Sequence, residues 1–184
     1  MKYIVVVGSV EPRKNIALVI DACSELGAEY QSQCSLIVIG ALGWQNLKVQ
    51  QSAKKLDHKM ECIFLGYVPD AVVIEWYKKA FVVVCPSLDE GFGFPPLEAM
   101  AVGAPVIVSD APALIEISGG GAMVVKRNDP SRLAATLALL LNNEEEREAL
   151  MARGKQHVRK FAVEEMITNT LMIYKKVCKI KSYN

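Results

Sequence analysis

Two carboxylates with seven residues between them flank a glycine-rich turn in the middle of the chain. They are Glu90 and Glu98, and the turn contains Gly91 and Gly93. Glycines let backbone N–H groups approach a ligand closely, and a turn that leads into a helix N-terminus is typical of an anion site. Carboxylates beside such a site would repel phosphate but accept hydrogen bonds from hydroxyl groups. The combination predicts a ligand that carries both phosphate and sugar.

Two adjacent cations, Arg13 and Lys14, follow the first apolar run, which ends at Gly8. The planar fork of arginine and the point charge of lysine suit a diphosphate. A solvated helix start is the alternative, but cations near a helix N-terminus are unfavourable unless an anion is close by. We therefore expect Arg13 and Lys14 to clamp a diphosphate. The absence of a G-x-G-x-x-G motif after this run argues against a dehydrogenase.

Three further loops offer weaker candidates. Gly66 and Val68 could present backbone groups to a flat base, but a plain turn into a helix capped by Asp70 explains them at least as well. Trp44 either lines the same cleft or packs on the sheet edge. We expect Asp110 to cap a helix rather than to act in catalysis.

The composition is that of a globular protein with one domain. The chain has 184 residues, 52% hydrophobic and 22% charged, and its net charge of +1 gives no general attraction for nucleic acid. The five cysteines lack C-x-x-C spacing, so we expect reduced thiols in a cytoplasmic protein and no zinc site. No apolar run approaches the ~20 residues of a membrane helix. Because the chain opens directly on an apolar run, we expect it to be one domain of a larger protein.

Short apolar runs alternate with longer amphipathic segments along the chain. The runs are continuous and rich in valine and isoleucine, which is typical of strands buried on both faces. The alternation predicts an α/β fold, a Rossmann-like doubly wound parallel sheet of about six strands with ligands at their carboxyl ends. The predicted strands are Tyr3–Val7, Ser35–Ile39, Cys62–Leu65, Phe81–Cys85, Pro105–Val108 and Ala122–Val125. The predicted helices are Ile16–Glu29, Gln45–Leu56, Ala71–Lys79, Pro95–Ala101, Ala111–Glu116, two more after the caps Asp129 and Asn143, and a terminal one at 162–178.

Taken in order, these motifs resemble the donor-binding, C-terminal domain of retaining group 1 glycosyltransferases with the GT-B fold. The resemblance covers nearly the whole chain, and the block from Glu90 to Glu98 is its most specific part. Ser9 stands where many members carry arginine, which shifts the binding of phosphate onto Arg13 and Lys14. The matching pieces are residues 7–15, 64–68, 86–101, 103–107 and 109–110.

The resemblance implies a role for each residue of the candidate site. Arg13 and Lys14 would hold the donor diphosphate. Glu90 would bond the transferred sugar and steady positive charge near its anomeric carbon, which makes these three the expected catalytic residues. Glu98 would accept hydrogen bonds from the ribose hydroxyls. The other expected contacts are Phe92, Gly93 and Phe94 with the sugar and distal phosphate, Leu97 with the donor, and Gly66 to Val68 with the nucleobase.

The same resemblance implies hexose transfer, with retained anomeric configuration, from a UDP-, GDP- or ADP-sugar to a glycan or lipid-linked acceptor. No cofactor or metal is expected, because the cations neutralise the leaving diphosphate and an Asp-x-Asp motif is absent. These residues supply only the donor half, so we expect an N-terminal acceptor-binding domain, of the same or another chain, as partner. The terminal helix at 162–178 is expected to cross to that domain. Alone, the chain is expected to be inactive or to form a homodimer.

Two alternative functions stay open. One is a non-catalytic nucleotide-sugar binding module that pairs with a separate acceptor domain. The other is a nucleotide-sugar epimerase, which the Phe-Gly-Phe-Pro-Pro segment at 92–96 disfavours. The basic segment 175–181 permits weak contact with the cytoplasmic face of a membrane or with an acidic partner, although a solvated helix end explains it more simply.

Overall fold

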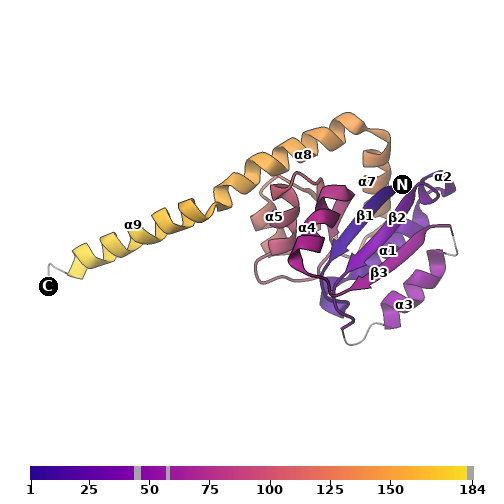
Figure 1. Cartoon of the computed structure of the whole chain (residues 1–184), viewed down its shortest axis with the longest axis horizontal. Coiled ribbons are helices and arrows are strands. Elements are labelled where there is room, and N and C mark those ends of the chain that lie inside the picture. The colour runs from indigo at the N-terminus through magenta and orange to yellow at the C-terminus, as the bar shows by residue number, and fades with distance from the viewer. Residues whose placement is uncertain (44–46, 57–58, 182–184) are drawn as a thin grey trace.

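The computed structural model of the chain describes residues 1–43, 47–56 and 59–181. Within them a single six-stranded sheet runs in the order β3-β2-β1-β4-β5-β6, and every pair of neighbours is parallel (Figure 1). This confirms the predicted doubly wound fold. The strands are β1 Lys2–Val7, β2 Cys34–Ile39, β3 Glu61–Gly66, β4 Ala80–Cys85, β5 Val106–Ser109 and β6 Met123–Val125.

Helices follow the strands nearly as the sequence predicts. The helices are α1 Ile16–Glu25, α2 Ala28–Gln31, α3 Leu47–Ala53, α4 Asp70–Lys79, α5 Phe94–Ala101, α6 Pro112–Ser118, α7 Pro130–Asn142, α8 Glu144–Val158 and α9 Val163–Lys181. Short 3-10 turns lie at Pro12–Lys14, Lys54–Leu56 and Arg159–Phe161. The predicted start of α3 at Gln45, and Trp44 with it, falls outside the described residues.

The prediction of one continuous helix from Ile16 to Glu29 is wrong. The helix α1 ends at Glu25, and Leu26 has extended backbone. The buried side chain of Gln31 explains the break, because its amide donates to the carbonyl oxygens of Cys23, Ser24 and Leu26. These are carbonyls that a helix C-terminus leaves without partners in the helix. A glutamine brought in from the next helix therefore satisfies them and allows the chain to turn.

Successive side chains of each strand pack into opposite layers, which is why the strands read as continuous apolar runs. In β1, Ile4 and Val6 face the layer that contains α1, α3 and α7. Val5 faces the layer that contains α4, α5 and α6. Ile4, Val5 and Val6 are each at most 2% exposed. The sheet thus separates two apolar cores, one on each face, and the positions of its strand ends determine where the connecting loops lie.

Two of the four helix caps named above are confirmed. The side chains of Asp129 and Asn143 accept hydrogen bonds from backbone N–H groups in the first turns of α7 and α8. Asp70 and Asp110 were wrongly predicted as caps. The capping positions of α4 and α6 are Pro69 and Ala111, and neither helix has a side-chain cap.

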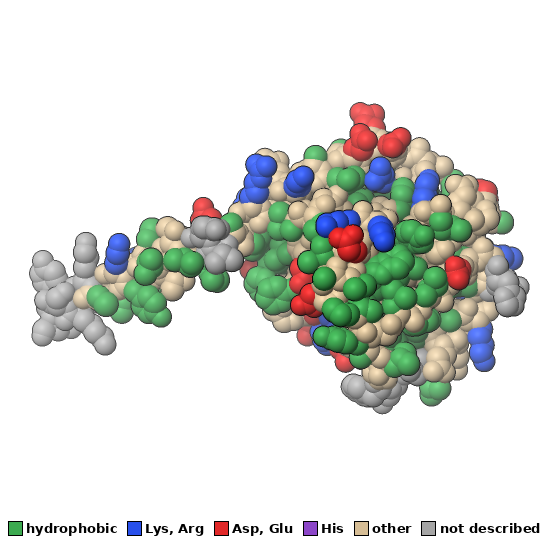
Figure 2. Space-filling model, in the orientation of Figure 1, with side chains coloured by type: hydrophobic (Ala, Val, Ile, Leu, Met, Phe, Trp, Pro, Cys, Tyr) green, Lys and Arg blue, Asp and Glu red, His purple; other side chains and the backbone are tan. Residues whose placement is uncertain are grey.

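The last helix, α9, extends away from the body of the domain (Figure 1). Figure 2 shows apolar side chains gathered along this arm. No helix among the described residues is long and apolar enough to cross a membrane. The exposed apolar side chains of α9 are Met166, Ile167, Leu171, Met172, Ile173, Tyr174 and Val177.

The order of the strands decides where a ligand can bind. β1 has β2 on one side and β4 on the other, and the direction of winding reverses between β1 and β4. In open α/β sheets, ligands bind in the crevice outside the carboxyl ends of the strands at such a switch point. The loops that leave this point are residues 8–15 after β1 and residues 86–93 after β4. They contain both cations and the first carboxylate of the predicted site.

Candidate functional site

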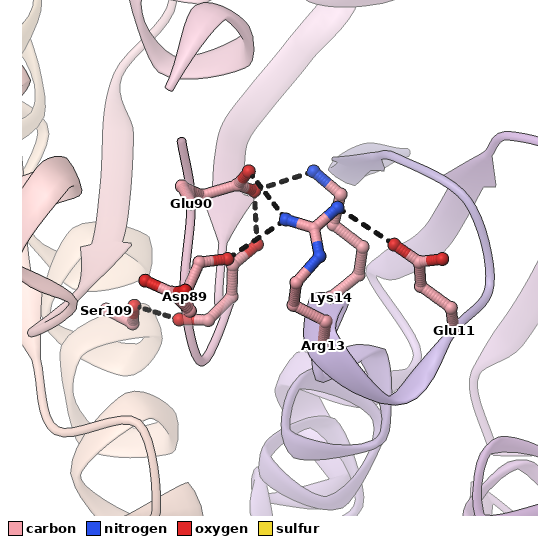
Figure 3. A network of polar contacts seen from close by, with 7 residues as sticks. Glu11, Arg13, Lys14, Asp89, Glu90 and Ser109 are labelled. Carbon is pink, nitrogen blue, oxygen red and sulfur yellow. Dashed lines mark hydrogen bonds and ion pairs between the residues drawn. The ribbon is translucent and has the colours of Figure 1, made fainter. Parts of the chain in front are cut away.

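Arg13 and Lys14 meet Glu90 across the switch point (Figure 3). Lys14 Nζ lies 2.6 Å from Glu90 Oε1, and Arg13 Nη1 lies 3.0 Å from Glu90 Oε2. The Glu90 and Lys14 side chains are 11% and 13% exposed, whereas that of Arg13 is 45% exposed. Arg13 Nη2 also pairs with Glu11 at 2.9 Å. The structure therefore brings all three predicted catalytic residues together, and their roles in catalysis stay predictions.

Local backbone structure sets the direction of both cations. Pro12 starts a 3-10 turn that contains Arg13 and Lys14, and Asn15 ends the turn in the left-handed region with φ of 53°. The side chain of Lys14 then runs across Gly8. A Cβ built on Gly8 would lie only 3.2 Å from the Lys14 Cδ and Cε atoms. A glycine at the end of β1 thus leaves room for the lysine to reach Glu90.

The electrostatics of the pair keep Glu90 ionised. Burial would raise the pKa of the Glu90 carboxyl, but hydrogen bonds from Lys14, Ser87 and Arg13 outweigh it and hold the pKa below its ordinary value of 4.5. The hydrogen bond to Glu90 in turn raises the pKa of the Arg13 guanidinium. Ser87, which lies 2.7 Å from Glu90 Oε1, is buried. The arrangement offers a fixed negative charge next to two cations.

The glycine turn after Glu90 leads into α5 as predicted, but its two glycines differ. Gly93 has φ of 101° and precedes the helix, and a Cβ there would lie 3.0 Å from Ile117 and 3.1 Å from Leu114. Gly91 has no atom within 4 Å of a built Cβ, and its φ lies outside the left-handed region. Only Gly93 is therefore required as glycine by both its backbone conformation and its packing.

The other predicted contacts of this turn divide between surface and core. Phe92 and Phe94 are 46% and 63% exposed, and their ring centroids lie 4.7 Å apart. Leu97 is only 7% exposed and packs in the apolar core. The Leu97 side chain therefore packs into the protein interior, and the predicted contact of this residue with the donor stays a prediction.

Glu98 lies one turn into α5, on the exposed side of the helix. The buried Tyr77 of α4 donates from its hydroxyl to Glu98 Oε2 over 3.2 Å. Gly66, at the end of β3, has φ of 69°, and its carbonyl accepts from Gly40 N at 2.9 Å. Val68 is half-buried. No hydrogen bond between side chains of the described residues joins Glu98 or this loop to Glu90, so the structure places them at the same sheet edge but in separate groups.

Two residues that hold the site, Asn15 and Arg127, were not assigned a role from the sequence, and a third, Asp110, was assigned the wrong one. Asn15 Nδ2 donates to the carbonyl oxygens of Pro86 and Arg127, at 3.1 Å and 2.9 Å. Asp110 accepts from Arg127 N and Nε, both at 3.0 Å, and the backbone hydrogen bond holds the pKa of Asp110 below its usual range. Asn15 gave one signal, since asparagine tolerates the left-handed conformation. Arg127 gave none.

Metal binding has no evident site here. In residues 1–43, 47–56 and 59–181, no group of three or more histidine, cysteine, aspartate or glutamate side chains is placed to hold a metal ion. The charged side chains that the structure brings together at the switch point include Arg13, Lys14, Glu11 and Glu90.

The fold and the site define a class of protein. The chain belongs to the family of glycosyl transferases group 1, which matches residues 1–157. It is 35% identical to the O-antigen chain mannosyltransferase B of Escherichia coli over 94% of this chain and 45% of that protein. It is 37% identical to the O-antigen chain mannosyltransferase RfbU of Salmonella typhimurium over 69% of this chain and 35% of that protein. The chain thus spans less than half the length of these relatives.

Solved structures agree with the family. The crystal structure of the C-terminal domain of a glycosyl transferase group 1 family protein (LpcC) from Francisella tularensis superposes with a TM-score of 0.77 and 27% identity. The match covers 88% of this chain and 87% of that domain. Anabaena Alr3699/HepE in complex with UDP has the same fold, with a TM-score of 0.80 and 18% identity, over 96% of this chain and 48% of that protein. The chain therefore has the fold of a GT-B C-terminal domain.

Proposed function

We propose that this chain is the donor-binding domain of a retaining hexosyltransferase, which transfers a hexose from a nucleotide diphosphate sugar to a glycan or lipid-linked acceptor. The observation that carries the proposal is the convergence of Arg13, Lys14 and Glu90 at the switch point of a group 1 family fold. The names of the relatives favour mannose as the hexose. GDP-mannose is accordingly the first donor to test.

Arg13 and Lys14 would neutralise the diphosphate as it leaves. Negative charge on the leaving group grows as the bond between the anomeric carbon and the phosphate oxygen breaks, and fixed cations stabilise that charge without reorganisation. Two cations on one short turn supply the charge that a metal ion supplies in other transferases. We therefore propose a reaction that needs no metal and no cofactor.

Glu90 would have two successive sets of partners. The donor diphosphate competes with its carboxylate for Lys14 and Arg13, because both anions use the same N–H donors. Ser87 keeps its hydrogen bond to Glu90 during this exchange. The carboxylate can then accept a hydrogen bond from a sugar hydroxyl and steady positive charge at the anomeric carbon. Its lowered pKa supports this role, since the group must stay ionised.

The rest of the donor would lie along the same sheet edge. Backbone groups of Phe92, Gly93 and Phe94, at the start of α5, would contact the sugar and the distal phosphate. Glu98 would accept hydrogen bonds from the ribose, in an orientation supported by Tyr77. Gly66 to Val68 would meet the nucleobase. The base contact would thus follow β3 and the phosphate contacts β1, whereas the ribose and sugar contacts both lie on the segment that follows β4.

The acceptor would be held by a second domain. The matched segment covers 45% and 35% of the two mannosyltransferase relatives, and α9 exposes apolar side chains over much of its length (Figure 2). We propose that α9 packs against an N-terminal acceptor-binding domain of the same or another chain, and that the chain alone either dimerises or does not turn over. Weak contact with the cytoplasmic face of a membrane belongs to the same proposal, since Lys175 and Lys176 lie on this arm.

Calorimetric titration of the chain with UDP, GDP, UDP-glucose and GDP-mannose tests the proposal. At least one nucleotide is expected to bind, and Glu98→Ala and Arg13→Ala are expected to weaken that binding. The proposal fails if no nucleotide binds to the folded chain, or if both variants bind as the wild type does. A non-catalytic binding module would bind the nucleotide sugar equally well, so a transfer assay with the acceptor-binding domain added separates these two functions.

A further inference from the structure

Four consecutive backbone carbonyls lead up to Glu90, and each accepts a hydrogen bond from a side chain elsewhere in the fold. They belong to residues 86–89, which connect β4 to the glycine turn. The donors come from the last residue of β5 and from the loops after β1 and β6, so side chains rather than sheet pairing determine the path of this segment. The four contacts are Asn15 Nδ2 to Pro86 O at 3.1 Å, Ser109 Oγ to Ser87 O, Arg127 Nη1 to Leu88 O at 2.7 Å, and Arg13 Nη1 to Asp89 O at 3.0 Å.

Arg127 makes the most extensive contribution to this set. Its Nη1 donates to Leu88 O at 2.7 Å, its Nε to Asp110 Oδ1 at 3.0 Å and its Nη2 to Asp110 O at 3.3 Å. Its backbone N–H also donates to Asp110 Oδ1. All three nitrogens of the guanidinium are therefore engaged by protein oxygens. A planar guanidinium that contacts two loops at once is suited to bridging them.

The position of Arg127 connects the segment to both neighbouring sheet loops. Arg127 lies just after β6, and Asp110 lies just after β5. The carbonyl oxygen of Arg127 accepts from Asn15 Nδ2, and Asn15 ends the turn that carries Arg13 and Lys14. Leu88 N–H completes the circuit by donating to Arg13 O at 2.8 Å. The cations and the carboxylate are thus held in one connected set of hydrogen bonds.

We propose that Arg127 is a positioning residue that sets where Glu90 lies in the donor site. It acts through Leu88 O, two residues before Glu90, and it does not touch the donor. The structural part of this inference stands on the hydrogen bonds alone, and only its effect on sugar binding rests on the proposed function.

Amide hydrogen exchange of the chain tests the structural part. Arg127→Met removes the donors and keeps a side chain of similar length, and Lys126→Met is the matched control because Lys126 is exposed one residue earlier. Loss of a charge-assisted hydrogen bond is expected to speed the exchange of the Leu88 amide about tenfold in Arg127→Met. The control is expected to leave it unchanged. Equal exchange in Arg127→Met and wild type would overturn the inference.

A second variant tests the inference in case Arg127→Met does not fold. Arg127→Lys retains a cation for Asp110, but a single ammonium cannot bridge Asp110 and Leu88 O with the geometry of a guanidinium fork. The Leu88 amide is therefore expected to exchange faster than in the wild type here too, in a chain whose thermal unfolding matches the wild type. Wild-type exchange in this variant would count against the bridging role.

Measurements of GDP and GDP-mannose binding then distinguish the positioning role of Arg127 from the proposed function of the chain. Arg127→Met is expected to bind GDP within about twofold of wild type and to bind GDP-mannose roughly five- to tenfold more weakly, since the variant keeps Arg13 and Lys14 and the direct donor contact proposed for Glu90 is with the sugar. In a Glu90→Gln background the same substitution is expected to have no further effect on GDP-mannose. Additive effects of the two substitutions would overturn the positioning role. If the Leu88 amide exchanges faster in Arg127→Met but the wild-type chain binds no nucleotide, the proposed function fails while the structural role of Arg127 stands.

Discussion

Lys14 Nζ lies 2.6 Å from Glu90 Oε1, so a cation expected to bind phosphate is bonded to the carboxylate expected to bind sugar. The two residues come from loops after β1 and β4, more than seventy positions apart in the sequence. Because of this contact, Glu90 would compete with phosphate for Lys14, and Lys14 would compete with a sugar hydroxyl for Glu90. Under the proposed function, a diphosphate would compete with Glu90 for Lys14, and a displaced carboxylate would become available to the sugar. Binding of the two parts of the donor would then be coupled.

Glu90→Gln is expected to destabilise the chain at pH 7 by about 1–3 kcal/mol, because Lys14 would lose its charged partner in a half-buried site. The folded-state pKa of Glu90 is lowered, so its contribution is fully present above the ordinary value of 4.5 and is lost as pH falls through the folded pKa. Urea unfolding at pH 7 and pH 3 measures the effect, and the gap between variant and wild type should shrink at pH 3. Glu75→Gln removes a carboxylate from an exposed pair with Lys78 and is the control. A gap that grows in acid would contradict the prediction.

Lys14→Met and Arg13→Met are expected to differ in stability. Lys14 is 13% exposed and Arg13 is 45% exposed, and both contact Glu90. Loss of the shielded lysine is expected to cost about 1–3 kcal/mol, whereas an exposed pair contributes little. Chemical denaturation of the two variants provides the measurement. A larger loss for Arg13→Met than for Lys14→Met would show that burial does not rank these contacts.

Gly93→Ala is expected to destabilise the chain by about 1–3 kcal/mol, since φ of 101° strains any residue with a Cβ. Its Cβ would also press on Leu114 and Ile117. Gly91→Ala is the matched control, because a Cβ at that position meets no atom within 4 Å. Thermal unfolding of the pair decides the matter. Equal melting temperatures for the two variants would mean that the start of α5 adapts to the extra carbon.

Tyr77→Phe is expected to weaken nucleotide binding roughly threefold, because it removes the hydroxyl that orients the Glu98 carboxylate. Glu98→Gln should have a larger effect, since it removes the charge that would accept hydrogen bonds from the ribose hydroxyls under the proposed function. The substitution at Tyr77 should leave binding of inorganic pyrophosphate unchanged. Titration of each variant with GDP and with pyrophosphate tests this. Equal loss for both ligands in Tyr77→Phe would indicate a general disturbance of the site.

Much of the fold could be predicted because parallel strands buried on both faces leave continuous apolar runs, such as residues 34–39. The strands beside the site were found for the same reason. The end of α1 could not be predicted, because Gln31 terminates it through tertiary contacts. The role of Asp110 was missed likewise, since its partner Arg127 lies on another loop. Polar partners distant in the sequence carry no local pattern.

The cations and the carboxylate of the site could each be predicted from the sequence, but the direct contact between them could not. Arg13, Lys14 and Glu90 each follow a strand, which places them at one edge of a parallel sheet. Their direct contact requires that β1 and β4 be neighbours, and apolar patterning does not specify strand order. The place of Leu97 within the motif likewise did not reveal that its side chain, on α5, packs into the core.

The most direct test of the assignment of the diphosphate to Arg13 and Lys14 is a comparison of nucleoside diphosphate and monophosphate affinities. Wild-type chain is expected to bind GDP at least about tenfold more tightly than GMP, because the terminal phosphate gains Lys14 and Arg13. In Lys14→Met the ratio should fall to roughly threefold, because only Arg13 remains for the terminal phosphate. Calorimetric titration of both proteins with both ligands gives the ratio. An unchanged preference for GDP in folded Lys14→Met would contradict the assignment of the diphosphate to these cations.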